Sequence, residues 1–147
     1  MKYLLFIVVL LLIFCSSCIS TGEGGDGTQT TLYNYSGLDV EFQLFRKGKY
    51  ISSSFIKNGE GKEYTLNAEE GGPLGPTLPP FETVTDSVQV IYGELASIWH
   101  TKAANQIVSK SLLLASSYKG GKVKDGLYEF TYTFTEDDFQ EAVDFGD

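Results

Sequence analysis

From residue 31 onward, short stretches of alternating apolar and polar residues recur between glycine-containing turns. This alternation is typical of β-strands that are buried on one face. The stretch 38–44 shows it most clearly, with Leu38, Val40, Phe42 and Leu44 on one side and Asp39, Glu41 and Gln43 on the other. We therefore expect a body made mainly of strands.

Four turn signals predict β-hairpins: Ser36-Gly37, Lys47-Gly48, Asn58-Gly59 and Gly93-Glu94. The strands that they would join are 31–35, 38–44, 50–57 and 62–66, and then 87–92 and 95–101. Asn-Gly is the strongest of these signals, because both central residues of the favoured tight turn adopt positive φ. In the last hairpin the apolar side chains available for burial are Val88, Val90, Ile98 and Trp99.

Two segments interrupt this pattern. Residues 68–81 hold all four prolines and three glycines, which predicts a long loop, either functional or a plain crossover between sheets. Residues 103–115 carry apolar side chains at helical spacing, but the run at 112–114 also fits a strand or a buried loop.

The C-terminal region predicts a strand and then a helix. Aromatic residues alternate with polar ones over 128–135, and we expect the aromatic face, Tyr128, Phe130, Tyr132 and Phe134, to be buried. Thr135 and the acids at 136–138 can cap a helix N-terminus. Its apolar side, Phe139, Ala142 and Val143, would dock on the sheet.

About seven short strands at this spacing predict an all-β fold, an antiparallel β-sandwich with a short C-terminal helix. An immunoglobulin-like or a transthyretin-like arrangement would fit. The alternative is an α+β fold, a single curved sheet with helices on one face, which a helix at 103–115 would favour.

The N-terminus has the pattern of an export signal. Met1 and Lys2 precede an apolar run of twelve residues, 3–14, which is shorter than the roughly 20 residues that a membrane-spanning helix needs. Ser16-Ser17-Cys18 then resembles the lipobox of bacterial lipoproteins, with Cys15 where a branched apolar residue is usual. The resemblance implies cleavage after residue 17 and a diacylated, membrane-anchored Cys18.

This interpretation divides the chain into a signal peptide at 1–17, a lipidated cysteine and flexible tether at 18–30, and a single domain at 31–147. The tether is polar and glycine-rich. Acyl chains on Cys18 would hold the protein on the outer membrane of the cell envelope, where the periplasmic face and the cell surface both remain open. With Cys18 the one cysteine of the mature chain, we expect no disulfide and no cysteine-based zinc site.

The net charge of −8 becomes −9 once Lys2 leaves with the signal, which disfavours nucleic-acid binding. The basic stretches 46–49 and 119–124 contain glycine and are typical of turns. His100, the single histidine, is expected at the rim of the domain rather than in a catalytic site. No metal, cofactor or phosphate-loop pattern stands out, and we predict no catalytic residues.

Carboxylates occur in clusters that leave a glycosidase-like pair open: Glu69, Glu70, Glu136, Asp137, Asp138, Asp144 and Asp147. The aromatic surplus has a second interpretation, because exposed Tyr and Trp on a sandwich can stack on sugar rings. Tyr33, Tyr35, Tyr50 and Trp99 cannot be assigned to the core or the surface from the pattern.

The order of lipobox, short acidic tether, Asn-Tyr-Ser-Gly turn and closing aromatic strand resembles the small lipoproteins of unassigned function in Bacteroidota-type genomes. That resemblance implies an exported, lipid-anchored β domain. We expect a non-enzymatic binding or accessory module whose ligand is a protein or a glycan. The alternatives are a hydrolase that uses two carboxylates, with Glu69 or Glu70 as one of them, and a structural component of an outer-membrane complex.

Overall fold

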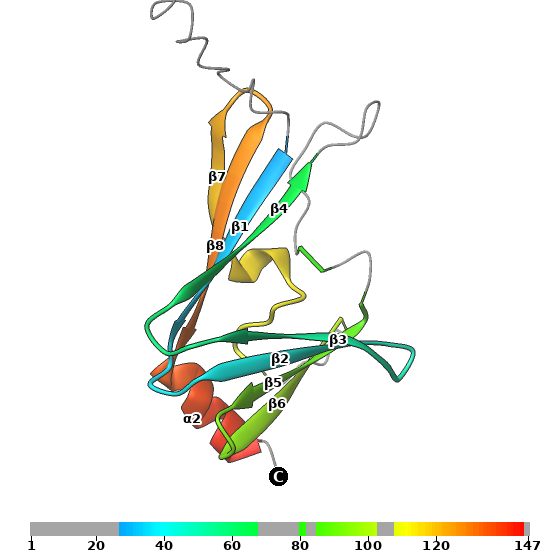
Figure 1. Cartoon of the computed structure of the whole chain (residues 1–147), viewed down its shortest axis with the longest axis vertical. Coiled ribbons are helices and arrows are strands. Elements are labelled where there is room, and N and C mark those ends of the chain that lie inside the picture. The colour runs from blue at the N-terminus through cyan, green and yellow to red at the C-terminus, as the bar shows by residue number, and fades with distance from the viewer. Residues whose placement is uncertain (1–26, 68–79, 82–84, 103–107, 146–147) are drawn as a thin grey trace, which may run out of the picture.

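A computed structural model describes residues 27–67, 80–81, 85–102 and 108–145 of the chain. These residues form eight strands and a C-terminal α-helix (Figure 1). The strands are β1 (Gly27–Tyr35), β2 (Val40–Arg46), β3 (Lys49–Ile56), β4 (Gly61–Asn67), β5 (Ser87–Tyr92), β6 (Ala96–Thr101), β7 (Lys119–Lys124) and β8 (Leu127–Thr135), and the helix is α2 (Glu136–Phe145). A single 3₁₀ turn, η1 (Ala115–Ser117), precedes β7. The predicted all-β class with a short C-terminal helix is confirmed.

The strands form two four-stranded sheets, consistent with a β-sandwich. The first sheet has the order β4-β1-β8-β7 and the second has the order β3-β2-β5-β6. All neighbours are antiparallel except β1 and β8, which run parallel over their whole length. In Figure 1 the strands of the first sheet run along the long axis of the molecule, whereas β2 and β3 of the second sheet run across it and β5 and β6 run obliquely. The α+β alternative, a single sheet, is therefore wrong.

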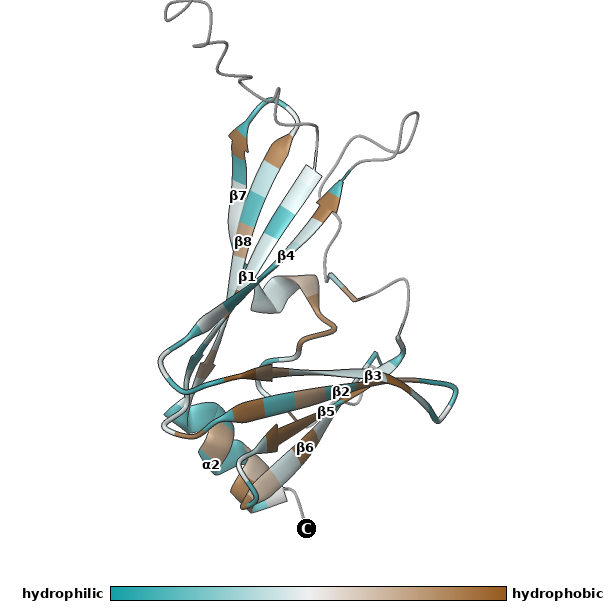
Figure 2. Cartoon of the chain, viewed as in Figure 1, coloured by the Kyte–Doolittle hydropathy of each residue, from teal (hydrophilic) through white to brown (hydrophobic). Residues whose placement is uncertain are grey.

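The core lies where the inner faces of the two sheets meet. Val40 and Phe42 of β2 are fully buried, as the alternation over 38–44 predicts, and so are Val88 and Val90 of β5. Phe42 contacts Phe134 of β8 in the opposite sheet, with ring centroids 6.4 Å apart. Figure 2 shows that strongly hydrophobic residues gather on the second sheet, while the first is paler and more polar.

Two of the four predicted hairpins are wrong, because the chain changes sheets at those turns. Ser36-Gly37 leads from β1 in the first sheet to β2 in the second, and Asn58-Gly59 leads from β3 back to β4 in the first. Gly59 adopts a positive φ of 82°, as the predicted turn requires, but the strands on either side of the turn, β3 and β4, do not pair with each other. Tight-turn residues define local geometry, and partner strands depend on the whole sheet.

Asn34 at the end of β1 ties these two crossovers together. It is fully buried, and its Nδ2 donates to the carbonyls of Leu38 at 2.8 Å and Ile56 at 2.9 Å. Its Oδ1 accepts from the backbone N–H of Ser36 at 3.1 Å and from the Ser36 hydroxyl at 2.8 Å. The backbone N–H of Asn34 donates to the Glu60 carbonyl, and its carbonyl accepts from the Gly59 N–H. One amide thus satisfies the backbone of both connections, which explains why the chain crosses here rather than forming hairpins.

The other two hairpins are confirmed. β2 and β3 pair across Lys47 and Gly48, which both have positive φ, at 51° and 71°. β5 and β6 pair across Gly93.

The basic stretch at 119–124 is not a turn. It forms β7, which pairs with β8 at the edge of the first sheet, and its lysines are largely solvent-exposed, as edge strands favour.

The first strand begins before residue 31, where the sequence pattern places the start of the domain. β1 begins at Gly27, and Thr28 and Thr30 are buried on its inner face. The stretch 27–30 is polar, so its burial in a sheet between β4 and β8 gave no hydrophobic signal.

Of the ambiguous stretch at 103–115, residues 103–107 lie outside the described part of the chain. The rest is a buried turn: Leu112 and Leu113 enter the core, and no α-helix forms over 108–115.

The C-terminal strand and helix form as predicted, but Tyr128 and Phe130, expected in the buried aromatic face, are only partly buried. Tyr132 and Phe134 of β8 are buried, and α2 begins directly after Thr135. Asp138 accepts from the Thr135 backbone N–H at 2.7 Å, as in a capping box, and from Lys110 Nζ at 2.7 Å. Phe139 contacts Tyr92, with centroids 5.9 Å apart, which docks the helix on the sheets. Val143, expected to dock as well, is 46% exposed.

Candidate functional site

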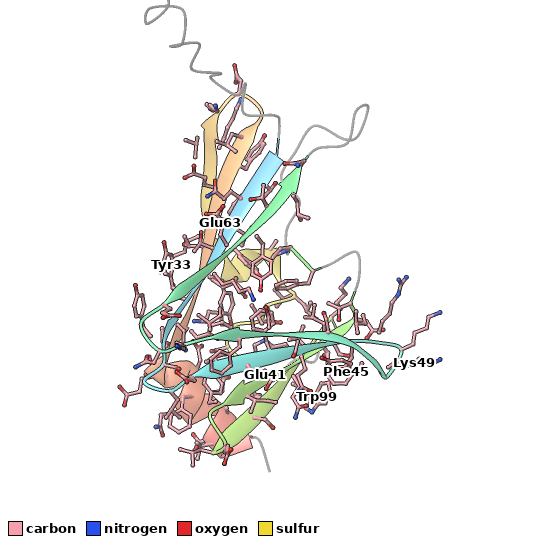
Figure 3. All side chains as sticks on the ribbon, in the orientation of Figure 1. Tyr33, Glu41, Phe45, Lys49, Glu63 and Trp99 are labelled. Atoms are coloured by element: carbon pink, nitrogen blue, oxygen red, sulfur yellow. The ribbon has the colours of Figure 1, made fainter. Side chains whose placement is uncertain are left out.

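Three aromatic rings lie in contact on the outer face of the second sheet, and we call Phe45, Tyr50 and Trp99 the aromatic platform. Phe45 on β2 is the register partner of Tyr50 on β3, and their ring centroids are 5.9 Å apart in an edge-on arrangement. The Phe45 and Trp99 centroids lie 4.9 Å apart. Figure 3 shows Phe45 and Trp99 side by side near the end of this sheet. The rings therefore form one apolar surface.

Strand pairing explains how rings from β2 and β6 meet across β5. The residue of β5 opposite Phe45 is Ser87, whose small side chain leaves room above it. Trp99 is one register row further along, opposite Gln89, so its ring reaches Phe45 diagonally. A register shift between Leu44 and Phe45 lies at the same point in β2. Such irregularities redirect side chains at sheet edges.

The platform is open to solvent although its rings touch. Tyr50 is 57% exposed and Trp99 is 47% exposed, while Phe45 between them is half-buried. Aromatic pairs are stabilised beyond their buried area by roughly 0.5 to 1.5 kcal/mol. The rings therefore hold one another in place and still present free faces.

The backbone beneath Phe45 is fixed by the start of β5. The Phe45 N–H donates to Thr85 Oγ1 at 3.2 Å, and its carbonyl accepts from the Thr85 hydroxyl and from the Asp86 N–H. Asp86 Oδ2 also accepts from the Lys47 N–H at 2.7 Å, and this bond lowers the pKa of Asp86. The β2–β3 turn next to Tyr50 is thereby held to β5.

Polar groups continue the outer face beyond the rings. Gln43 and Gln89 are register partners, in the same row as Trp99. Gln43 Nε2 donates to Glu41 Oε1 at 3.0 Å, and Gln89 Nε2 donates to Ser97 Oγ at 3.2 Å. Each of these bonds uses one N–H donor of a glutamine amide. The amide group also has a second N–H donor and an acceptor oxygen. The face thus combines apolar rings with oriented amides.

The outer face of the first sheet also carries two tyrosines, Tyr33 and Tyr35, whose rings stack with centroids 6.0 Å apart. Figure 3 shows Tyr33 beside the first sheet, away from Trp99 on the second. A Cβ added to Gly61 would lie 2.8 Å from the Tyr33 ring, so this ring covers the glycine of the neighbouring strand. Tyr33 is thus accounted for by sheet packing, in a face otherwise rich in threonine.

His100 is not a rim residue. It is 3% exposed and faces the core, because Trp99 takes the outward position next to it on β6. Its Nδ1 accepts from the Leu112 N–H at 3.1 Å, which fastens the buried turn to β6. Burial lowers the pKa of His100 to about 4, with Asp138 raising it and Lys110 lowering it less strongly. The imidazole is therefore neutral, faces the core and makes a structural hydrogen bond.

The acidic clusters divide into described and undescribed parts. Glu69, Glu70 and Asp147 lie outside the described residues. Glu136 and Asp137 are exposed at the start of α2, and Asp138 caps it. Among the described residues no group of three or more His, Cys, Asp or Glu side chains could hold a metal ion.

Cys18 and the signal segment also lie outside the described residues, so the lipid anchor stays a prediction. Within the described part of the chain, no helix has the length and apolar character needed to cross a bilayer.

The sequence contains a signal for the platform that is not part of any catalytic motif, namely aromatic residues at outward positions of alternating strands. Along β2 the outward positions read Asp39, Glu41, Gln43 and then Phe45, so an aromatic residue breaks a polar row. Trp99 likewise falls between outward-facing Ser97 and Thr101. An aromatic residue at a polar position of an alternating strand marks an exposed ring.

Comparison of the chain with protein families, curated proteins and solved structures finds no match in any of the three.

Proposed function

We propose that the chain is a lipid-anchored protein of the bacterial cell envelope whose β-sandwich binds a glycan on the aromatic platform. The observation that carries this proposal is the contact of three rings on an outer sheet face, with Tyr50 and Trp99 about half exposed. Contiguous exposed apolar surface on a soluble domain usually marks a binding site. The platform is held rigidly, so little conformational entropy is lost when a ligand binds.

The chemistry of the face fits a sugar. One side of a pyranose ring is lined by C–H groups and packs on an aromatic ring, while its edge carries hydroxyls. Gln43 and Gln89 lie within one register row of Trp99 and offer amide groups to such hydroxyls. A protein ligand is the alternative for the same face, and the choice of a glycan rests on the mixture of flat rings and amides.

A carboxylate-dependent hydrolase finds less support. Such an enzyme places two carboxyl groups on either side of the bond that it cuts. The described acidic cluster at 136–138 lies at the helix start, where Asp138 is bonded to Thr135 and Lys110. Asp138 therefore has a structural role at the helix start.

The glycan proposal is tested by isothermal titration of the full chain, purified in detergent, with neutral oligosaccharides: cello-, xylo-, manno- and malto-hexaose. We expect one of them to bind, and Trp99→Ala to weaken that binding at least tenfold. Tyr35→Ala, on the other sheet, is the control and should bind like the parent. Absence of binding to any neutral glycan, or equal binding by Trp99→Ala, would overturn the proposal.

The membrane anchor has its own test, because Cys18 alone would carry the acyl chains. Stable attachment needs two or more chains, since each buried methylene contributes about 0.8 kcal/mol. We expect Cys18→Ala to abolish labelling by radioactive palmitate and to accumulate uncut precursor, while Cys15→Ala is processed and labelled normally. Normal processing of Cys18→Ala would contradict the anchor and leave the glycan proposal standing.

A further inference from the structure

A groove adjoins the aromatic platform at the β5–β6 end of the second sheet. It has a volume of about 420 Å³ and lies between the outer face of this hairpin and helix α2. Its lining includes Gln89, Ile91 and Ser97 from the sheet, Leu95 from the turn and Val143 from the helix. Loop, sheet and helix therefore build one concave surface.

The groove begins in the same register row as Trp99 of the platform, so the two surfaces adjoin. Gln89 lines the groove and is the register partner of Trp99. Ser97, whose hydroxyl oxygen lies 3.2 Å from Gln89 Nε2, comes two residues before Trp99 in β6 and therefore lies on the same face of the strand. The six residues of β5 that underlie this surface span roughly 20 Å at about 3.3 Å per residue. That length accommodates more than one sugar ring.

Two apolar side chains are exposed at the far end of the groove. Leu95 at the hairpin turn is 72% exposed, and Val143 on α2 is 46% exposed. Both side chains line the groove, and their contact with a ligand would remove this surface from water. The distal groove therefore offers a second apolar contact, separate from the rings.

Charge restricts what can occupy the groove. Glu94 lines it, and Glu41 lies in the register row of Ile91 and Ser97. The described lining residues include no lysine, arginine or histidine that could balance an anion. A uronic acid or a phosphate placed here would face carboxylates without a counter-charge.

We infer that the ligand is an uncharged glycan chain of several sugar units that begins on the aromatic platform and continues past Gln89 through the groove to α2. This inference rests on the proposed function and specifies the length and charge of its ligand. The platform supplies stacking at one end, and the groove adds contacts that only a longer chain can reach.

The test is a chain-length series of the neutral sugars named above, from one to six units, with oligogalacturonides as acidic counterparts, titrated into the full chain. We expect affinity for the neutral series to rise at least tenfold from two units to six, and the acidic series to bind more weakly at every length. Ser97→Tyr, which fills the groove floor, should retain the binding of two units and lose most of the gain. Val143→Glu, an exposed change on α2, should reduce the gain without altering the fold.

The outcomes separate the two proposals. Short chains that bind through Trp99, with no gain for longer ones or an unchanged gain in both groove variants, would overturn the extended ligand and keep the platform. Tighter binding of oligogalacturonides would overturn the uncharged ligand. Loss of all glycan binding in the parent protein would overturn both proposals. Thr131→Tyr, on the outer face of the first sheet, is the control for adding a ring and should behave as the parent does.

Discussion

The outer faces of the two sheets each carry aromatic side chains, but the rings are used differently. On the first sheet Tyr33 lies over Gly61 and stacks on Tyr35, among threonines. On the second sheet Phe45 and Trp99 come from strands that are not neighbours and meet above β5. The first arrangement fills a gap in the sheet, whereas nothing in the sheet beneath requires the second.

The comparison teaches that exposure alone does not identify a binding surface. Tyr35 and Tyr50 are almost equally exposed, at 58% and 57%. They differ in their surroundings, because Tyr50 belongs to a three-ring cluster beside two amides and Tyr35 to a stacked pair. The two tyrosines therefore serve as matched positions for testing the platform.

The largest effect should come from removing Asn34, the side chain that ties together the two connections between the sheets. Asn34→Ala removes four hydrogen bonds, including those to the carbonyls of Leu38 and Ile56, while the Leu38 carbonyl keeps its bond from the Ser36 hydroxyl. We expect the free energy of unfolding to fall by about 3 to 5 kcal/mol, measured by urea denaturation. Asn58→Ala, which loses one exposed bond to Gly37, is the control and should cost less than about 1 kcal/mol. Equal losses would contradict the role of Asn34.

Acidification should weaken the packing beneath the platform through His100. Its folded pKa of about 4 is below its ordinary value of 6.5, so the unfolded chain binds the proton first as the pH falls. Stability from this group is complete above pH 6.5 and is lost between 6.5 and 4, by about 3 kcal/mol in total.

The control for that pH dependence is His100→Gln, which keeps an acceptor for the Leu112 N–H and cannot titrate. Denaturation midpoints of the variant should fall less steeply between pH 6.5 and 4 than those of the parent. Asp138 and Lys110, whose charges act on His100, are present in both proteins. Parallel curves would show that His100 does not titrate as its burial requires.

The matched tyrosines give the next effect. Tyr50→Ala should weaken binding of the neutral hexasaccharide about tenfold, since removing one ring contact costs of the order of 1 to 2 kcal/mol. Tyr35→Ala should leave the dissociation constant within twofold of the parent. Weaker binding in Tyr35→Ala than in Tyr50→Ala, measured by calorimetry, would place the ligand on the first sheet and contradict binding on the platform.

The smallest effect concerns the first sheet alone. Gly61→Ala puts a methyl group 2.8 Å from the Tyr33 ring, which must shift. The residual strain should exceed the gain in chain stiffness and lower stability by about 1 kcal/mol or less. Glycan binding should not change. Loss of binding in this variant would couple the two faces, contrary to the separate uses described here.

The sequence predicted the strands better than their partners. Alternation located β2, β5 and β8 because their inner positions, such as Val40, Val90 and Phe134, are apolar. It missed the start of β1, since Thr28 and Thr30 are buried without being hydrophobic. It also predicted hairpins at Ser36-Gly37 and Asn58-Gly59, because the long-range bonds of Asn34 leave no local pattern.

The sequence pattern predicted only part of the candidate site. Sequence raised sugar stacking as a use for exposed aromatics but could not place Tyr50 or Trp99 inside or outside. The contact between Phe45 and Trp99 depends on β5 lying between β2 and β6, which sheet order alone establishes. The groove depends on where α2 docks, and the pattern assigned Val143, which lines it, to the side of the helix that packs on the sheet.

The most direct test uses the single tryptophan of the chain as its own reporter. Because Trp99 is about half exposed, its fluorescence should be quenched readily by acrylamide in the free protein. Addition of the neutral hexasaccharide should shift the emission to shorter wavelength and protect it from quenching, with the same dissociation constant as calorimetry. Calorimetric binding with unchanged emission and quenching would place the sugar elsewhere and contradict the platform.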